Sequence, residues 1–267
     1  MAAVWPFRVL LHAYGSWLTH DGRPLDRAGA LDRPFRRRLS VLGRTVVTMR
    51  TVIAGGHGKI ALRLETLLST RGDEVAGLIR RPEQAADLRE RGAEPIVCDL
   101  ERASVDEVAG HLRGADAVVF AAGAGPGSGV DRKRTVDHAA AVLFADAAER
   151  AGVRRYVIVS SMGADSEPPP GTDPVFAEYL RAKRAADEDI KARPGLDWTV
   201  LRPGALTDDA GTGFVALAEH TGRGSVPRDD VAAVLAALLA EPGTAGRTLE
   251  LIGGPVPVIE AVKAAAA

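Results

Sequence analysis

The sequence of 267 residues has little of three features that would place it in a special class of protein. It holds one cysteine, Cys98, so no internal disulfide can form, which fits a protein of the reducing cytoplasm. Its longest apolar runs, such as residues 231–239, stop well short of the roughly 20 residues that span a bilayer. An excess of charge is also missing, because 34 basic residues face 35 acidic ones. Without a net field to attract nucleic acid or an anionic membrane, we expect neither partner.

Cys98 closes an alternating stretch that is typical of a strand. A small buried thiol is the simpler interpretation of such a cysteine, and a reactive nucleophile is the alternative. Metal-ligating residues show no diagnostic spacing, because His57 and His138 stand as single histidines without partner ligands. The sequence therefore predicts no metal site.

Residues 1–48 differ from the rest of the chain. They contain three consecutive arginines at 36–38 and scattered prolines, and no apolar period of two or 3.6 residues continues through them. Pro6, Arg8 and His12 interrupt the opening residues, so a secretory signal is not expected. We interpret residues 1–48 as an N-terminal extension that is disordered or a start-site artefact, with an Arg-rich targeting or docking segment as the alternative. Met49 stands directly before the first predicted strand.

From Met49 onward, short β-branched runs alternate with amphipathic stretches of helical length. This alternation is typical of βαβ units, whose right-handed crossovers build a parallel sheet. We predict strands at residues 51–54, 74–79, 95–98, 117–120, 156–159, 199–201 and 248–252. Helices are predicted from about residues 59, 83, 105, 133 and 175, and a further helix over 229–239 with Asp229 or Asp230 as its cap. The predicted fold class is α/β: a Rossmann-type doubly wound parallel sheet over residues 49–267, with a small C-terminal region on the substrate side.

A glycine-rich turn joins the first predicted strand to the first predicted helix. It consists of Gly55, Gly56, His57, Gly58, Lys59 and Ile60, followed by Ala61. A pyrophosphate needs exposed backbone N–H groups at the start of a helix, and residues without side chains so that the backbone can approach closely. A glycine turn can also serve a purely steric purpose. Its position in the first βαβ unit favours a dinucleotide site.

The second predicted strand ends in Arg80 and Arg81, where an NAD enzyme would present a carboxylate to the ribose 2′-hydroxyl. A guanidinium can pair with a 2′-phosphate, so we predict NADP as the cofactor, with NADPH preferred over NADH. The alternative is two solvated surface arginines. Residues at the ends of later strands are also predicted to contact the cofactor, although Asp99 could equally cap a turn and Arg202 could meet a substrate anion. These residues are Asp99, Leu100, Ala121, Ala122, Gly123, Arg202 and Pro203.

Tyr179 and Lys183 lie four residues apart in a predicted helix, which places both side chains on one face. A neighbouring ammonium favours a phenolate, so such a pair suits proton exchange with a carbonyl or hydroxyl. Ser160 and Ser161 end the fifth strand at the carboxyl edge of the sheet, where either hydroxyl could hold a substrate oxygen. We predict these four residues as the catalytic set. The alternatives are a surface ion pair and serines that cap a turn.

Four segments of the chain resemble the atypical short-chain dehydrogenases/reductases with an NAD(P)H-binding domain, a group with NAD-dependent epimerase/dehydratase-like and NmrA-like members. These segments are residues 55–61, 160–164, 179–183 and 201–207, and the likeness extends from Met49 to about Val262. The resemblance implies NAD(P) in the glycine cleft and, where the set is retained, a serine, a tyrosine and a lysine acting on a carbonyl or alcohol. Two departures concern the geometry: Ala61 replaces the final glycine, and the serines lie further ahead of the tyrosine than in the main dehydrogenase family.

Two functions from different classes are compatible with these residues. The first is an NADP(H)-dependent oxidoreductase that transfers a hydride to or from a carbonyl, a quinone or a flavin-like small molecule. The second is a regulator, similar to the NmrA-like members, that binds NADP without catalysis; a sugar epimerase-like enzyme is a third candidate. A small-molecule substrate is expected in the enzymatic cases, and a homodimer is compatible with the sequence.

Overall fold

The computed structural model describes residues 38–41, 44–125 and 127–267, and the chain divides into two compact units, Met1–Val47 and Thr48–Ala267. In the first unit, β1 (Arg38–Val41) pairs antiparallel with β2 (Arg44–Val47). The sequence analysis did not predict this pair of strands. The prediction of a disordered extension concerns chiefly residues 1–37, which lie outside the described residues.

The second unit is built around a nine-stranded sheet with the order β13-β10-β12-β8-β7-β6-β3-β4-β5. Seven neighbouring strands run parallel: β3 (Arg50–Ala54), β4 (Glu74–Ile79), β5 (Glu94–Val97), β6 (Ala117–Phe120), β7 (Arg155–Val159), β8 (Asp197–Pro203) and β12 (Arg247–Gly253). Antiparallel strands β10 (Phe214–Ala218) and β13 (Val256–Pro257) extend one edge. The chain moves outward from β3 to β5 and then returns to β6, so β3 and β6 form the topological switch point. This order confirms the predicted Rossmann-type sheet.

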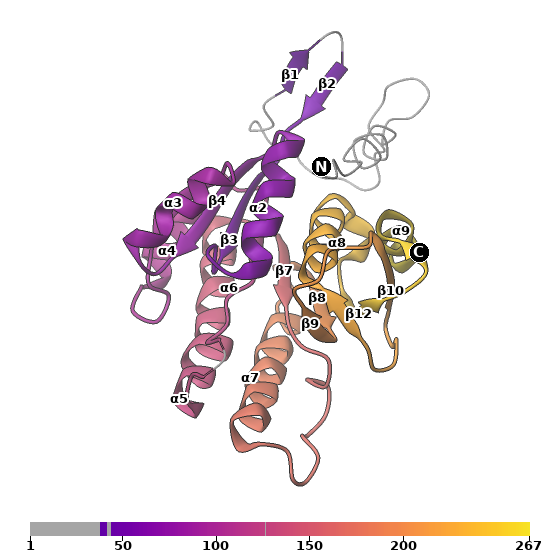
Figure 1. The fold of residues 1–267 in the computed structure, drawn as a ribbon. Coiled ribbons are helices and arrows are strands. Elements are labelled where there is room, and N and C mark those ends of the chain that lie inside the picture. The colour runs from indigo at the N-terminus through magenta and orange to yellow at the C-terminus, as the bar shows by residue number, and fades with distance from the viewer. Residues whose placement is uncertain (1–37, 42–43, 126) are drawn as a thin grey trace, which may run out of the picture. The chain divides into compact units, whose positions relative to one another are not determined.

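Helices cover both faces of this sheet (Figure 1). One face packs against α2 (Lys59–Arg71), α3 (Ala85–Glu90), α8 (Arg228–Ala240) and α9 (Val258–Ala266). The other packs against α4 (Val105–Leu112), α6 (Ala140–Ala151) and α7 (Pro174–Lys191). Successive strand side chains point to opposite faces, so Ile53 of β3 belongs to the first core and Val52 to the second. Burial on both faces explains why these strands are continuous apolar runs.

Short elements complete the second unit. The 3-10 turns are η2 (Pro82–Gln84) and η4 (Pro242–Thr244), and a separate parallel pair joins β9 (Ala205–Thr207) to β11 (Ser225–Pro227). The helix predicted near residue 133 starts with α5 (Val130–Arg132) and continues as a π-helical segment, η3 (Lys133–Ala139), before α6. Among the described helices, none is both long and apolar enough to cross a membrane.

The predicted cap of the C-terminal helix is wrong. The residue that precedes α8 is Pro227, which makes no side-chain cap, and Asp229 and Asp230 lie inside the first helical turn. The Asp230 carboxylate instead accepts hydrogen bonds from the backbone N–H groups of Thr212 (2.9 Å) and Gly213 (2.8 Å). It therefore ties the segment before β10 to α8, a long-range contact that local capping rules do not contain.

Candidate dinucleotide and reaction site

The glycine turn lies at the switch point between β3 and β6. Gly55 has a φ of +78°, a conformation that favours glycine, and a Cβ there would lie 2.6 Å from the Cα of Ala122. The small residues after β6 therefore contact the glycine turn directly. The N–H of Gly58 donates to the carbonyl of Gly55 (2.8 Å), and that of Gly56 donates to Leu78 of β4 (2.9 Å). These bonds close the turn and hold it against the neighbouring strand.

Helix α2 presents an uncapped N-terminus to this turn. Gly58 precedes the helix and makes no side-chain cap, so the first-turn amides keep their capacity for an outside acceptor. The helix dipole favours an anion at that position. Ala61 is fully buried against the sheet, as expected of a position that only packs helix on strand. Nε2 of His57 lies 2.6 Å from Oδ2 of Asp87 on α3. A turn without side chains beside an uncapped helix fits the pyrophosphate of a dinucleotide.

A carboxyl group is buried beneath the glycine turn. Glu65 of α2 is fully buried, and neither carboxylate oxygen has a hydrogen-bond partner among the described residues. A Cβ on Gly56 would lie 3.0 Å from its Oε1, and one on Gly77 of β4 would lie 2.6 Å from it, so glycine at both positions leaves room for this side chain. Burial raises the pKa of Glu65 to about 8, although the charge of Arg91 opposes the shift. The group is therefore mostly neutral at pH 7.

Arg80 follows β4, as predicted, and its guanidinium is partly exposed. Its Nη1 lies 3.5 Å from Oε2 of Glu101, a carboxylate that also accepts hydrogen bonds from Arg132 (2.6 Å) and Thr135 (2.7 Å). Partial burial alone would favour the neutral acid, but these two hydrogen bonds and the charges of Arg132 and Arg80 lower the pKa of Glu101. A phosphate at this strand end would compete with Glu101 for Arg80. Arg81 is exposed beside it.

The residues after β5 form a turn. Oδ1 of Asp99 accepts a hydrogen bond from the N–H of Glu101 (3.1 Å), so this side chain caps its own turn, one of the two predicted roles. Leu100 packs partly buried against the second core. Burial, together with the charges of Glu107 and Asp99, raises the pKa of the Cys98 thiol to about 11. That direction fits a buried thiol and not a nucleophile.

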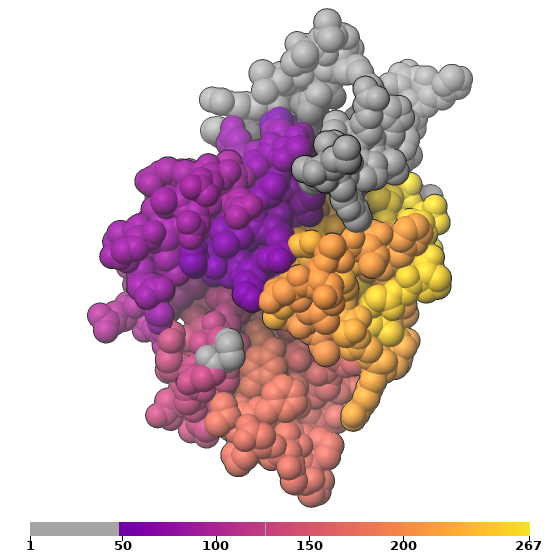
Figure 2. Space-filling view, in the orientation of Figure 1, coloured from indigo at the N-terminus to yellow at the C-terminus, as the bar shows by residue number. Residues whose placement is uncertain are grey.

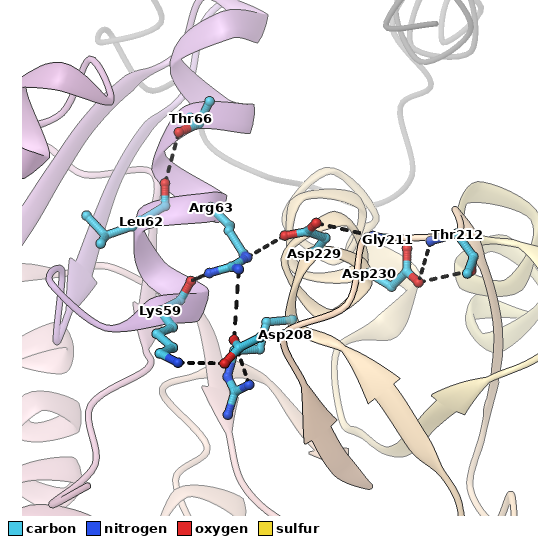
Figure 3. Close-up of polar contacts among 10 residues, drawn as sticks. Lys59, Leu62, Arg63, Thr66, Asp208, Gly211, Thr212, Asp229 and Asp230 are labelled. Atoms are coloured by element: carbon cyan, nitrogen blue, oxygen red, sulfur yellow. Dashed lines mark hydrogen bonds and ion pairs between the residues drawn. The ribbon is translucent and has the colours of Figure 1, made fainter. Parts of the chain in front are cut away.

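Cations near the glycine turn pair with acids from the C-terminal region (Figure 3). Nζ of Lys59 donates to Oδ2 of Asp208 (2.6 Å), which follows β9, and Arg228 donates to Oδ1 of the same carboxylate (2.8 Å). The hydrogen bond from Lys59 and the charges of Arg228 and Lys59 hold the pKa of Asp208 below its ordinary value. One turn further along α2, Arg63 pairs with Asp229 of α8. The start of α2 is thereby linked to the segments that follow β8.

Tyr179 and Lys183 lie on one face of α7, as their spacing predicted. Tyr179 is half-buried, and Nζ of the buried Lys183 lies 5.9 Å from the centroid of its ring. A second ammonium, that of Lys133 in η3, lies 5.4 Å from the same centroid and donates to the carbonyl of Gly125 (3.0 Å). Two cations therefore face the tyrosine ring, one more than the sequence indicated. In Figure 2 the surface is hollowed where the indigo, salmon and orange parts of this unit meet.

The ammonium of Lys183 is held by internal contacts. It donates to the carbonyl of Val159 (3.0 Å) and lies 3.4 Å from Oδ1 of Asp137. Asp137 is fully buried, and its other oxygen accepts a hydrogen bond from the N–H of Ala124 (3.3 Å). Asp137 therefore connects the loop after β6 to Lys183. The segment η3 supplies both Asp137 and Lys133, and π-helical turns are frequent at functional sites.

The two predicted serines differ in their contacts. Ser160 is buried and donates to Oδ2 of Asp187 (2.9 Å), and Arg202 donates to the same oxygen through Nε (3.0 Å) and Nη2 (2.9 Å). Burial raises the pKa of Asp187, which Arg202 partly offsets. Ser161 is half-buried and donates only to the adjacent carbonyl of Met162 (3.2 Å), a local bond that a substrate oxygen can replace. The guanidinium of Arg202 is engaged with α7, so its contact with a cofactor or substrate stays a prediction.

The remaining predicted contact residues lie at the same carboxyl edge: Ile60 in the first turn of α2, Ala121 and Gly123 after β6, and Pro203 at the end of β8. Sequence analysis missed Glu65, Lys133, Asp137 and Asp187. Asp187 follows Lys183 by four residues, so the helical spacing that paired Tyr179 with Lys183 could have revealed it. An acid among the leucines of a predicted helix was the signal for Glu65. Lys133 had no signal, because a π-helical register departs from the 3.6-residue period.

The fold and the geometry of this site indicate a class of protein. A glycine turn at the switch point of a parallel sheet, followed by an uncapped helix start, is typical of dinucleotide-binding Rossmann proteins, and the guanidinium after β4 stays a predicted contact. The family model for NAD(P)H-binding domains matches residues 55–242, and the chain belongs to this family.

Named relatives span reductases and epimerase-like proteins. The chain is 36% identical over 216 residues to a Bacillus subtilis protein named an uncharacterized sugar epimerase, which covers 80% of this chain and 99% of that protein. It is similar to the structure of a Bacillus halodurans protein provisionally named an NAD-dependent epimerase/dehydratase, with 36% identity, a TM-score of 0.75 and coverage of 81% and 99%. The anaerobilin reductase ChuY of Escherichia coli O157:H7 gives 25% identity, a TM-score of 0.66 and coverage of 78% and 98%.

Proposed function

We propose that the chain is an NADP(H)-dependent oxidoreductase of the atypical short-chain dehydrogenase/reductase type, which transfers a hydride to or from a carbonyl, quinone or flavin-like small molecule. The observation that carries this proposal is Tyr179, a half-buried phenol whose ring faces the ammonium groups of Lys133 and Lys183. Held by the glycine turn, the nicotinamide cofactor would supply or accept the hydride.

The chain's own residues then have distinct tasks. Tyr179 moves a proton to or from the substrate oxygen, and the ammonium groups of Lys133 and Lys183 lie against its ring. Asp137 and the carbonyl of Val159 keep the Lys183 ammonium in one place. Ser161 orients the substrate oxygen, because the hydroxyl of Ser160 is already engaged with a buried carboxylate.

The surroundings of Tyr179 favour a planar substrate. Phe176 is 50% exposed and stacks on the Tyr179 ring, with centroids 5.8 Å apart and an interplanar angle of 24°. An exposed flat ring beside the proton donor suits stacking with a quinone or a flavin-like ring. Arg80 supports the choice of NADP, because its partly exposed guanidinium follows β4, the strand after which Rossmann proteins bind the ribose, and could pair with a 2′-phosphate.

The test compares three forms of the full chain: unaltered, Tyr179→Phe and Tyr14→Phe, in which Tyr14 of residues 1–47 serves as a matched control. NADPH oxidation is followed with quinones, flavins and aldehydes, and NADPH affinity is measured by calorimetry. We expect turnover that falls at least about 100-fold in Tyr179→Phe, with unchanged NADPH affinity and an active control, because one general acid contributes on that order. Equal turnover in all three forms would exclude Tyr179 as the proton donor.

A non-catalytic regulator is the second candidate, and one internal bond favours it. The hydroxyl of Ser160, a member of the predicted catalytic set, is engaged with the buried carboxylate of Asp187. A redox-sensing regulator predicts tight NADP(H) binding without turnover on any substrate of the panel. An epimerase-like enzyme, suggested by the name of the Bacillus subtilis relative, predicts interconversion of sugar epimers without net consumption of NADPH.

A further inference from the structure

Three metal-ligating side chains meet between the end of β5 and helix α4, outside the site described above. They are Cys98, which follows β5, and Glu107 and His111, which lie one turn apart on α4. The thiol sulfur, a carboxylate oxygen and an imidazole nitrogen all lie within 4.8 Å of one another. Sequence spacing did not reveal this cluster, because its cysteine comes from a different element than its other two members.

Buried contacts fix the backbone segments that carry these three residues. The N–H of Cys98 donates to the carbonyl of Ile79 on β4 (2.8 Å), and its side chain is 5% exposed. Helix α4 is fixed by its buried face, which contains Val108, Ala109 and Leu112. The donor atoms are therefore presented by rigid elements. Glu107 is exposed and His111 half-buried, so these two side chains can rotate toward an ion while the cysteine stays in place.

The three donor groups are available. Within residues 48–125 and 127–267, no hydrogen bond or ion pair to any of the three side-chain donors is formed by another residue. Arg50 donates to the backbone carbonyl of His111 (3.4 Å) and not to its ring. The carboxylates of Glu107 and Asp99 lie close enough to Cys98 to act on its thiol, so the local field favours a cation.

We propose that Cys98, Glu107 and His111 form a binding site for one Zn²⁺ ion. Sulfur, imidazole nitrogen and carboxylate oxygen are the donors that zinc takes in proteins, whereas Mg²⁺ and Ca²⁺ prefer oxygen alone. Zinc bonds of about 2.0–2.3 Å at tetrahedral angles place donor atoms about 3.3–3.6 Å apart, so each donor pair has to close by at most about 1.5 Å. Zinc binding forms the Zn–S bond, and the thiol proton passes to solvent. Water takes the fourth position.

The location gives the site a role. Asp99 and Leu100, two of the predicted cofactor contacts, follow the cysteine directly at the carboxyl edge of the sheet. A metal ion that joins the end of β5 to α4 would brace this edge. Because zinc binds the folded chain and not a preformed site in the unfolded one, saturating zinc raises the melting temperature.

The test uses the full chain, reduced and stripped of metal with a chelator. Zn²⁺ affinity is measured by competition with a fluorescent chelator, and Co²⁺ is added separately as a spectroscopic probe. We expect one Zn²⁺ per chain, a near-ultraviolet thiolate-to-cobalt band, and more than about 100-fold weaker Zn²⁺ binding in Cys98→Ser and in His111→Gln. The matched control His220→Gln, an exposed histidine after β10, should bind as the unaltered chain does.

Two results would overturn the proposal. One is the absence of the thiolate-to-cobalt band in the unaltered chain. This measurement does not depend on whether any variant folds. The other is unchanged Zn²⁺ affinity in Cys98→Ser, which would place the ion at histidines elsewhere in the chain. Neither result depends on dinucleotide binding or on turnover, so this proposal and the proposed function fail independently.

Discussion

The buried carboxyl of Glu65 provides the sharpest test of the fold. Its folded-state pKa is raised from 4.5 to about 8, so the folded chain keeps a proton that the unfolded chain releases. The free energy of unfolding therefore falls as pH rises through the window from 4.5 to about 8 and levels off above it. At about 1.4 kcal/mol per pKa unit, the whole window corresponds to a loss of about 5 kcal/mol. Between about pH 5.5 and about pH 8.5, the expected loss is about 3 kcal/mol.

Glu65→Gln removes this ionisation with little change of shape. Urea unfolding at the two pH values gives the change in unfolding free energy for each chain. Other titrating groups contribute equally to both chains, so the unaltered chain should lose about 3 kcal/mol more than the variant does. Glu90→Gln on the exposed side of α3 is the matched control and should retain the full pH dependence. The reasoning is refuted if the unaltered chain and Glu65→Gln lose stability in parallel. Glu65 lies beneath the glycine turn, so its ionisation should also weaken dinucleotide binding. We expect affinity to fall between about pH 5.5 and about pH 8.5 in the unaltered chain and not in Glu65→Gln.

Two further predictions concern arginines at the carboxyl edge. Arg80→Ala should weaken NADP binding by about 1.5–3 kcal/mol in calorimetry while NAD binding changes little, because only NADP has the 2′-phosphate; an equal loss for both cofactors contradicts the assignment. Asp187→Asn leaves the buried guanidinium of Arg202 without its counter-charge, so urea unfolding should show about 3–5 kcal/mol of lost stability. A loss below about 1 kcal/mol would mean that water reaches Arg202.

The strands and helices of the parallel sheet could be predicted because their signals are local. Residues 74–79 and 117–120 were predicted with the bounds that the structure has, and α2 and α4 begin at the predicted residues. The C-terminal strands β10 and β13 were not predicted, since β13 has two residues and β10 carries no clear alternation between exposed and buried positions. Their existence depends on pairing with β12, which sequence periodicity does not encode.

The sequence predicted the backbone features of the candidate site, but it predicted the contacts of the charged and polar side chains only in part. The glycine turn is recognisable in the sequence because the site needs residues without side chains, and only glycine meets that need. The sequence located Tyr179 and Lys183 because four residues are one helical turn. It did not show that Ser160 donates to Asp187 while Ser161 makes only a local bond. That difference arises from the direction in which each side chain leaves the end of a buried strand.

By itself the sequence determined the order of βα units, the place of the glycine turn and the pairs one helical turn apart, because periodicity and steric demands act over short stretches of chain. The tertiary structure alone decided which charges neutralise one another. Lys183 meets Asp137, and Cys98 comes near Glu107 and His111, only after crossovers bring separate elements together. Electrostatic pairing depends on distance in space, and distance along the chain does not determine it.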